Sequence, residues 1–182
     1  GGLLSFASDD VARYLTILQS TLHLSIPYGD LLDPSPRDTP SVRAVLSSAQ
    51  RTSEWVEREL LSASDPSQAA ALITRFLEIA ESCRGLGNMP STHSIWAGLH
   101  APGVKPQAAA SAEALRNPGS LAVYAALGQH LAASSMGGRG EEAFSSNPSR
   151  PHIPLVEPHI AELERIHARG FAEGVPLFSA SE

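Results

Sequence analysis

The histidines are the residues of this sequence whose chemistry is easiest to name, because imidazole binds transition metals and transfers protons near neutral pH. Three of the seven, His152, His159 and His167, lie close to Glu157 and Glu162 along the chain. A zinc-binding helix needs two histidines at positions i and i+4 with an acid beside them, and no pair here has that spacing. We therefore predict structural or surface histidines and no metal site.

Other reactive patterns are incomplete. Residues 85–87 (Gly-Leu-Gly) match the opening of a dinucleotide-binding loop, but the third glycine is missing and Pro90 stands in its place. No Gly-x-Ser-x-Gly phrase is present to carry a serine nucleophile. Cys83 shares an apolar stripe with Phe76 and Ile79, which favours a packed, inert thiol over a nucleophile. The sequence therefore predicts no catalytic residue and no cofactor.

Composition and charge narrow the possible functions further. The chain has 182 residues, 42% of them hydrophobic, a formal net charge of −6 and one cysteine. That length fits a single domain, and an acidic chain without clustered Lys and Arg is poorly suited to nucleic acid. No apolar run approaches the roughly 20 residues that cross a bilayer. A lone cysteine suits a reducing compartment, so we expect a cytoplasmic domain with no nucleic-acid partner and no direct membrane insertion.

The elements that must position any site are helices. Apolar residues recur at helical spacing, and no segment keeps the period-two alternation of a strand. The pattern predicts helices at residues 11–24, 41–61, 66–84, 90–99, 108–115, 121–127 and 156–169. Trp55 lies beside the apolar face of one of these helices, so we expect it to pack against the core. The prediction is one irregular all-α domain over residues 1–182, with flexible connectors at 33–40 and 133–151.

Several residues predict where helices begin and end. Ser8 or Asp9 is a plausible N-cap of the first helix, because a short side-chain oxygen accepts hydrogen bonds from free amides. Asp65 is a stronger N-cap candidate, since proline follows it and Gln68 stands at the third helical position. Gly85 is expected to end that helix, because glycine adopts the left-handed conformation at little cost.

A set of short phrases occurs along the chain in an order that one family shares. Residues 53–56 match a Ser-x-Trp-Val phrase, and residues 95–99 match an Ile-x-x-Gly-Leu phrase. The principal matches cover residues 11–18, 53–56, 70–84, 86–91, 95–100 and 153–163. Together they resemble the catalytic domain of Ras-type guanine nucleotide exchange factors, the RasGEF domain.

This resemblance implies an all-α fold and a Ras-family small GTPase as partner, through which the domain would be recruited to membranes. An exchange factor binds the nucleotide-free GTPase more tightly than the loaded form, so by linkage it weakens nucleotide affinity. By analogy, the second switch region of the GTPase would contact a face formed by Leu46, Ser47, Gln50, Arg51, Ala80, Asn88 and His100. The alternatives are a helical module that binds a GTPase or adaptor without exchange, and an unrelated helical domain.

The departures from the family pattern bear on activity. Gly87, Met89 and Pro90 replace polar and aromatic residues that family members place near the GTPase, and Gln19 replaces an acid. In the family, a helical hairpin that displaces the first switch follows the segment matched by residues 153–163. No such hairpin is evident in this sequence. We therefore expect a diverged, C-terminally incomplete domain whose exchange activity is weak or absent.

Overall fold

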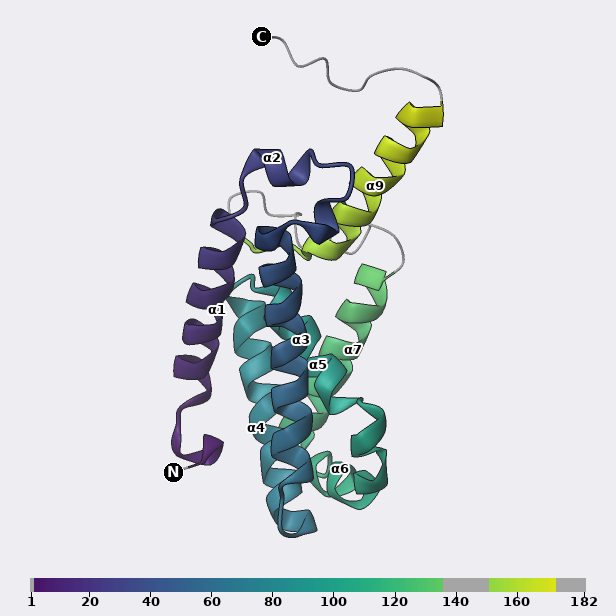
Figure 1. Cartoon of the computed structure of the whole chain (residues 1–182). Coiled ribbons are helices and arrows are strands. Elements are labelled where there is room, and N and C mark those ends of the chain that lie inside the picture. Colours follow the sequence, from purple (N-terminus) through teal and green to yellow (C-terminus); the bar gives the residue numbers. More distant parts are fainter. Residues whose placement is uncertain (1, 136–150, 173–182) are drawn as a thin grey trace.

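The regular structure of this protein is helical. The structure, a computed structural model, describes residues 2–135 and 151–172 (Figure 1). Its elements, with η for 3-10 helices, are η1 (Leu3–Ser5), α1 (Ser8–Leu24), α2 (Tyr28–Leu31), η2 (Pro36–Asp38), α3 (Pro40–Leu61), α4 (Pro66–Gly85), α5 (Met89–Leu99), η3 (Pro102–Gln107), α6 (Ala108–Ala114), α7 (Pro118–Ser135) and α9 (Val156–Ala172). Within the described ranges the sole strand-like pairing is one parallel bridge between Asn88 and Ile153. The all-α prediction is confirmed.

Two of the predicted segments have other bounds in the structure. The connector expected at residues 33–40 contains a 3-10 turn, and its last residue, Pro40, is already the first residue of α3. Proline suits that position because the first helical residue needs no amide hydrogen bond. The helix expected at residues 121–127 extends from Pro118 to Ser135, so it takes in the beginning of the expected loop. Residues 136–150 of that loop lie outside the described residues.

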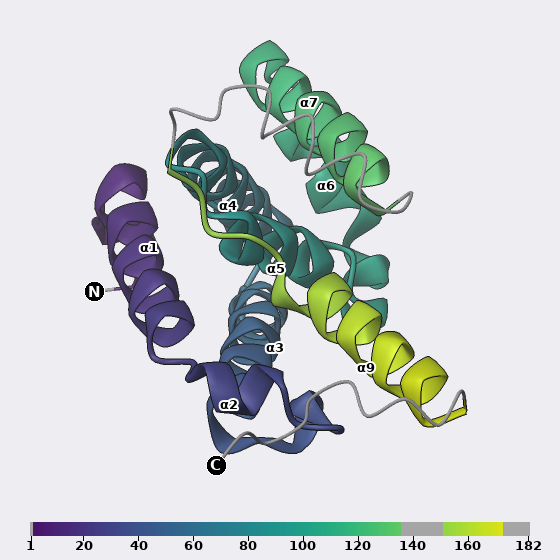
Figure 2. The ribbon, with the colours of Figure 1, turned by 90° about the horizontal axis from the view of Figure 1, so that it is seen from above.

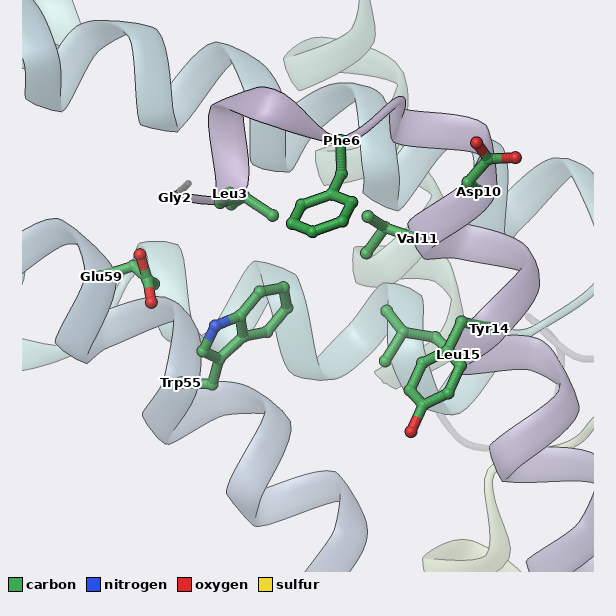
Figure 3. A pocket seen from close by; sticks show the side chains of 9 residues that line it. All are labelled: Gly2, Leu3, Phe6, Asp10, Val11, Tyr14, Leu15, Trp55 and Glu59. Atoms are coloured by element: carbon green, nitrogen blue, oxygen red, sulfur yellow. The ribbon is translucent and has the colours of Figure 1, made fainter.

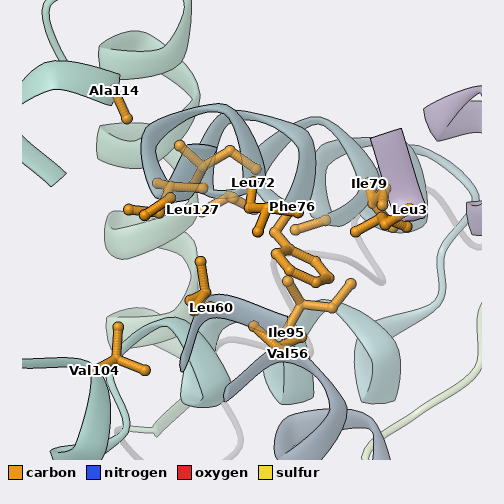
Figure 4. Close-up of a cluster of buried hydrophobic side chains, with 14 of the residues drawn as sticks. Leu3, Val56, Leu60, Leu72, Phe76, Ile79, Ile95, Val104, Ala114 and Leu127 are labelled. Atoms are coloured by element: carbon orange, nitrogen blue, oxygen red, sulfur yellow. The ribbon is translucent and has the colours of Figure 1, made fainter. Parts of the chain in front are cut away.

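The core is built around α4. This helix packs against α1, α5, α6 and α7, and Figure 2 shows it enclosed by them when seen from above. Phe76, Ile79 and Ala80 have no exposed surface. Figure 4 shows the Phe76 ring lying between side chains of neighbouring helices, close to Val56 and Ile95. Burial on several sides explains the wide apolar face that the sequence of α4 carries.

Helix α3 runs beside α5 in the same direction, and a glycine sets their close approach. A Cβ atom on Gly98 would lie 2.6 Å from the Ser53 carbonyl oxygen and 2.6 Å from Val56 Cβ. Real side chains do not approach so closely, so only glycine lets the two backbones meet here. This contact fixes the shape of the surface that α3 and α5 share.

The corner between α4 and α5 depends on Gly87. Gly87, rather than the predicted Gly85, has the left-handed backbone, with φ of +75°. Gly85 is the last residue of α4. The chain turns at Gly87, two residues later, and the Asn88 amide closes this turn by donating a hydrogen bond to the Cys83 carbonyl at 2.9 Å. The Gly87 carbonyl in turn accepts from the Ile153 amide at 2.8 Å. A distant segment of the chain therefore secures this corner.

Of the two predicted helix N-caps, one is confirmed and one was wrong. Asp65 accepts a hydrogen bond from the Gln68 amide at 2.8 Å and caps α4 as predicted. At the start of α1 the N-cap position is Ala7, which has no capping side chain. The Ser8 hydroxyl donates to Glu78 at 2.7 Å, and the Asp9 carboxylate accepts from the Ser82 hydroxyl. These two side chains join α1 to α4 and so are not used as caps.

Candidate functional site

A shallow groove runs between the parallel helices α3 and α5. Small side chains on both helices keep it open, and its volume is about 370 Å³. Its walls consist of Leu46, Ala49, Gln50 and Ser53 from α3 and His93, Ser94 and Ala97 from α5. Arg37 of η2 and Glu157 of α9 also line it. We call this surface the α3–α5 groove.

An ion-pair cluster joins η2 to α9 beside this groove. Arg37 Nη1 lies 3.1 Å from Glu157 Oε1, and Arg37 Nε lies 3.5 Å from Glu164 Oε1. The hydrogen bond that Arg37 donates to the Glu157 carboxylate is the main reason that the pKa of Arg37 is raised above its ordinary value. Because the Arg37 side chain is 41% exposed, solvent screens these pairs, and each contributes about 1 kcal/mol or less. The cluster therefore helps to orient the start of α9 but stabilises this orientation only weakly.

Four of the seven predicted site residues lie on one helix but divide between two surfaces. Leu46 and Gln50 line the α3–α5 groove. Ser47 and Arg51 are one position further round α3, at 100° per residue, on the ridge that faces away from α5. Arg51 is exposed and Ser47 half-buried. Ser47 and Arg51 thus lie on the outer side of α3, next to the groove but outside its lining.

Two other predicted site residues do not reach the surface. Ala80 and Asn88 are both 0% exposed. Asn88 is the N-cap of α5: its Oδ1 accepts from the Ser91 amide at 3.1 Å, and its Nδ2 donates to the Thr16 hydroxyl at 3.1 Å. The Asn88 side chain therefore fixes the start of α5 against α1. Because the Asn88 side chain is buried, it can affect the surface of α5 only by fixing where that helix begins.

The seventh predicted residue, His100, belongs to a different hollow. Its ring stacks on Trp96 with centroids 4.3 Å apart, and its Nε2 lies 3.0 Å from the Tyr124 hydroxyl. It lines a hollow of about 320 Å³ together with Ile73 of α4, Ser111 of α6, Tyr124 of α7 and the neighbouring Leu99, Val104 and Leu115. The structure does not bring His100 into the α3–α5 groove with Leu46 and Gln50.

Sequence reasoning missed the α5 wall of the groove. Ser94, Ala97 and Gly98 fall at i, i+3 and i+4, so they share one face of the helix. A face of small residues signals that another helix approaches closely, and that signal was present in the sequence. The contribution of Arg37 and Glu157 had no such signal, because the two residues are 120 positions apart.

Comparison with known proteins identifies the family. A family model described as the RasGEF domain matches residues 10–176. The chain belongs to the RasGEF domain family. Similar curated proteins are Ras guanine nucleotide exchange factors of Dictyostelium discoideum. Factor J is 25% identical over 97% of this chain, factor R is 27% identical over 81%, and factor A is 28% identical over 50%. The aligned regions make up 22%, 9% and 16% of those three proteins, so this chain spans only a small part of their length.

The one cysteine of this RasGEF domain, Cys83, lies in the core. Cys83 is 0% exposed, and burial raises the pKa of its thiol to about 12. A thiol with that pKa is protonated at neutral pH and is a poor nucleophile, which confirms the prediction of an inert cysteine.

Within the part of the chain that the structure describes, no helix combines the length and apolarity needed to traverse a bilayer.

Proposed function

We propose that this RasGEF domain binds a Ras-family small GTPase and promotes release of its guanine nucleotide, with the α3–α5 groove receiving the second switch region. Membership of the RasGEF family is the observation that carries this proposal. The groove supports it because it joins two of the predicted contact residues, Leu46 and Gln50, on an open surface.

The lining of the groove suits a mixed apolar and polar segment of a partner. Leu46, Ala49 and Ala97 offer aliphatic surface, while Gln50 and His93 offer side chains that both donate and accept hydrogen bonds. Among the described residues, Gln50 already donates to Glu54 at 2.7 Å, which holds its amide at the outer rim. A protein segment that inserts an apolar side chain and presents polar groups at the rim fits this arrangement.

The mechanism is one of linkage, without bond-making chemistry. Magnesium and phosphate contacts order the switch regions of a GTPase, so a partner that displaces them releases the nucleotide. Acceleration requires that the domain bind the empty GTPase more tightly than the loaded one, since equal affinity for both shifts no equilibrium. At the α4–α5 corner of this domain Asn88 and Met89 are buried and Leu86 is 43% exposed, so the corner offers a partner mainly one aliphatic side chain. We therefore infer weak exchange, and a domain that binds without exchange is the second candidate.

Release of a fluorescent guanine nucleotide from Ras, Rap and Ral proteins, measured with and without the domain, tests this function. Binding to nucleotide-free GTPases is measured in parallel by biolayer interferometry. The variant Leu46→Arg puts a charge in the groove and should reduce binding at least about tenfold, as for an interface core residue. Leu121→Arg, at an exposed leucine of α7, is the matched control and should leave binding unchanged.

The outcomes separate the candidates. Release that depends on Leu46 supports exchange through the groove, and Leu46-dependent binding without release supports the non-catalytic module. If no GTPase of the panel binds, or if both arginine variants reduce binding equally, the groove is not the docking surface.

A further inference from the structure

A second surface, on the other side of α3, is unused by the proposed function. It is a pocket of about 530 Å³ between η1, α1 and α3, and we call it the α1–α3 pocket. Figure 3 shows the Phe6 ring between Leu3 and Val11, facing Trp55 across the pocket, with Tyr14 further along α1. On α3, Trp55 is turned away from Gln50 by about 140° at 100° per residue, so the ridge of α3 separates this pocket from the α3–α5 groove.

The apolar surface of this pocket is exposed to an unusual degree. Phe6 is 59% exposed and Tyr14 is 68% exposed. Leu18, one turn after Tyr14 on the same face of α1, is also exposed. From Asp10 to Leu18 this face extends about 12 Å at 1.5 Å per residue, the length of two helical turns. Contiguous exposed apolar surface of this kind marks a binding site more often than a chance feature.

The charges at the pocket indicate the chemistry of its occupant. Asp10 of α1 and Glu59 of α3 lie on opposite sides of the aromatic side chains (Figure 3). Neither carboxylate takes part in a hydrogen bond or ion pair within the described part of the chain. An apolar floor between two free carboxylates is complementary to an apolar stripe flanked by basic residues. The same carboxylates disfavour an anionic lipid surface, as does the net charge of −6.

We propose that the α1–α3 pocket binds a basic amphipathic helix of a partner protein, whose aliphatic side chains lie against Phe6, Tyr14 and Trp55 and whose Lys or Arg side chains pair with Asp10 and Glu59. Such a helix presents its apolar face at i, i+3, i+4 and i+7, and two turns match the length of the exposed face of α1. Aromatic walls add attraction for the cationic side chains. Because α3 separates the two surfaces, this helix and a GTPase in the α3–α5 groove would bind without overlap.

Fluorescence polarisation with designed peptides tests the proposal. The probe is a labelled helical peptide of about 15 residues, with Leu on one face and Lys flanking that face. It should bind the domain, and versions with Glu for Lys or Ser for Leu should not. Asp10→Asn and Glu59→Gln should each weaken binding about two- to fivefold, as for exposed ion pairs, and added salt should weaken it further.

Glu57→Gln, which removes the same charge from the side of α3 next to Gly103 of η3, is the matched control and should leave affinity unchanged. Equal losses in Glu57→Gln and Glu59→Gln would show general attraction to an acidic surface and overturn the proposal. Failure of the Lys–Leu peptide to bind would also overturn it. Analytical ultracentrifugation adds a further check: a dimer abolished by Tyr14→Ser would show that a second copy of the chain covers the pocket. None of these variants lies in the α3–α5 groove, so their failure is distinct from failure of the proposed exchange function.

Discussion

Gly98 leaves no room for one added methyl group between α3 and α5. A Cβ in Gly98→Ala would lie 2.6 Å from the Ser53 carbonyl oxygen and from Val56 Cβ. Non-bonded carbon atoms prefer about 3.5–4.0 Å, so α3 and α5 must separate by about 1 Å. One of the two obstacles is backbone, which cannot rotate away as a flexible side chain can.

The expected free-energy change combines two opposing effects. Overpacking against a rigid neighbour costs about 3 kcal/mol, at the upper end of the usual range. Alanine recovers about 1 kcal/mol, because glycine is a poor helix former. Gly98→Ala should therefore lower the free energy of unfolding by about 2 kcal/mol. For a domain of this size that corresponds to a fall in Tm of about 4–8 °C.

Thermal unfolding followed by circular dichroism measures this change, and Gly85→Ala is the matched control. Gly85 is the last residue of α4, and a Cβ there meets no atom within 4 Å. It should be as stable as the parent or slightly more stable. If Gly98→Ala unfolds at or above the temperature of the parent chain, α3 and α5 do not approach as closely as described here, and the shape assigned to the groove is wrong.

Three further predictions concern the core and the caps. Trp55→Ala should lower the free energy of unfolding by about 3 kcal/mol in urea titrations, because Trp55 is half-buried and meets the Phe76 ring edge-on at 5.1 Å; an unchanged midpoint would show that this contact is absent. Asn88→Ala should cost about 1–2 kcal/mol through loss of the α5 cap, measured in the same way; a loss below about 0.3 kcal/mol would contradict the capping role. The backbone hydrogen bond from Gln68 is the main reason that the pKa of Asp65 is lowered, so Asp65 stabilises the fold above its unfolded-state pKa and this contribution disappears as pH falls through the folded-state value. The Tm of Asp65→Asn should accordingly depend less on acid pH than that of the parent, and parallel pH profiles would refute this.

The sequence predicted best those features that depend on near neighbours along the chain. Helical periodicity located α3 and α4 to within a residue or two, and the Asp65 cap needs only the amide of Gln68 three residues later. Ser8 shows where local reasoning fails. Its hydroxyl would suit a cap, but Glu78 of α4 takes its hydrogen bond instead. That competition depends on a residue 70 positions away, which no local pattern contains.

In the candidate site, too, some placements follow from nearby positions in the sequence and others depend on how distant elements pack. The family resemblance assigned Leu46 and Gln50, and both line the α3–α5 groove because residues four apart share one face of a helix. Ala80, Asn88 and His100 come from other elements, and their placement depends on how α4, α5 and α7 pack. A family resemblance assigns residues to positions in a fold, whereas burial and direction follow from the packing of this particular chain.

The segment that follows residue 150 has a consequence for the order in which the domain folds. Pro154 contacts His23 across 131 positions, and the α4–α5 corner joins α1 through Asn88 and Thr16 across 72 positions. Contacts of such long range form slowly, because the chain must lose loop entropy before they add any stability. Helices α3 and α4 can pair early, since one short turn separates them. The corner at Gly87 is completed only when residue 153 arrives, so a chain emerging from the ribosome already holds helices α1 to α7 before α9 adds Glu157 to the α3–α5 groove.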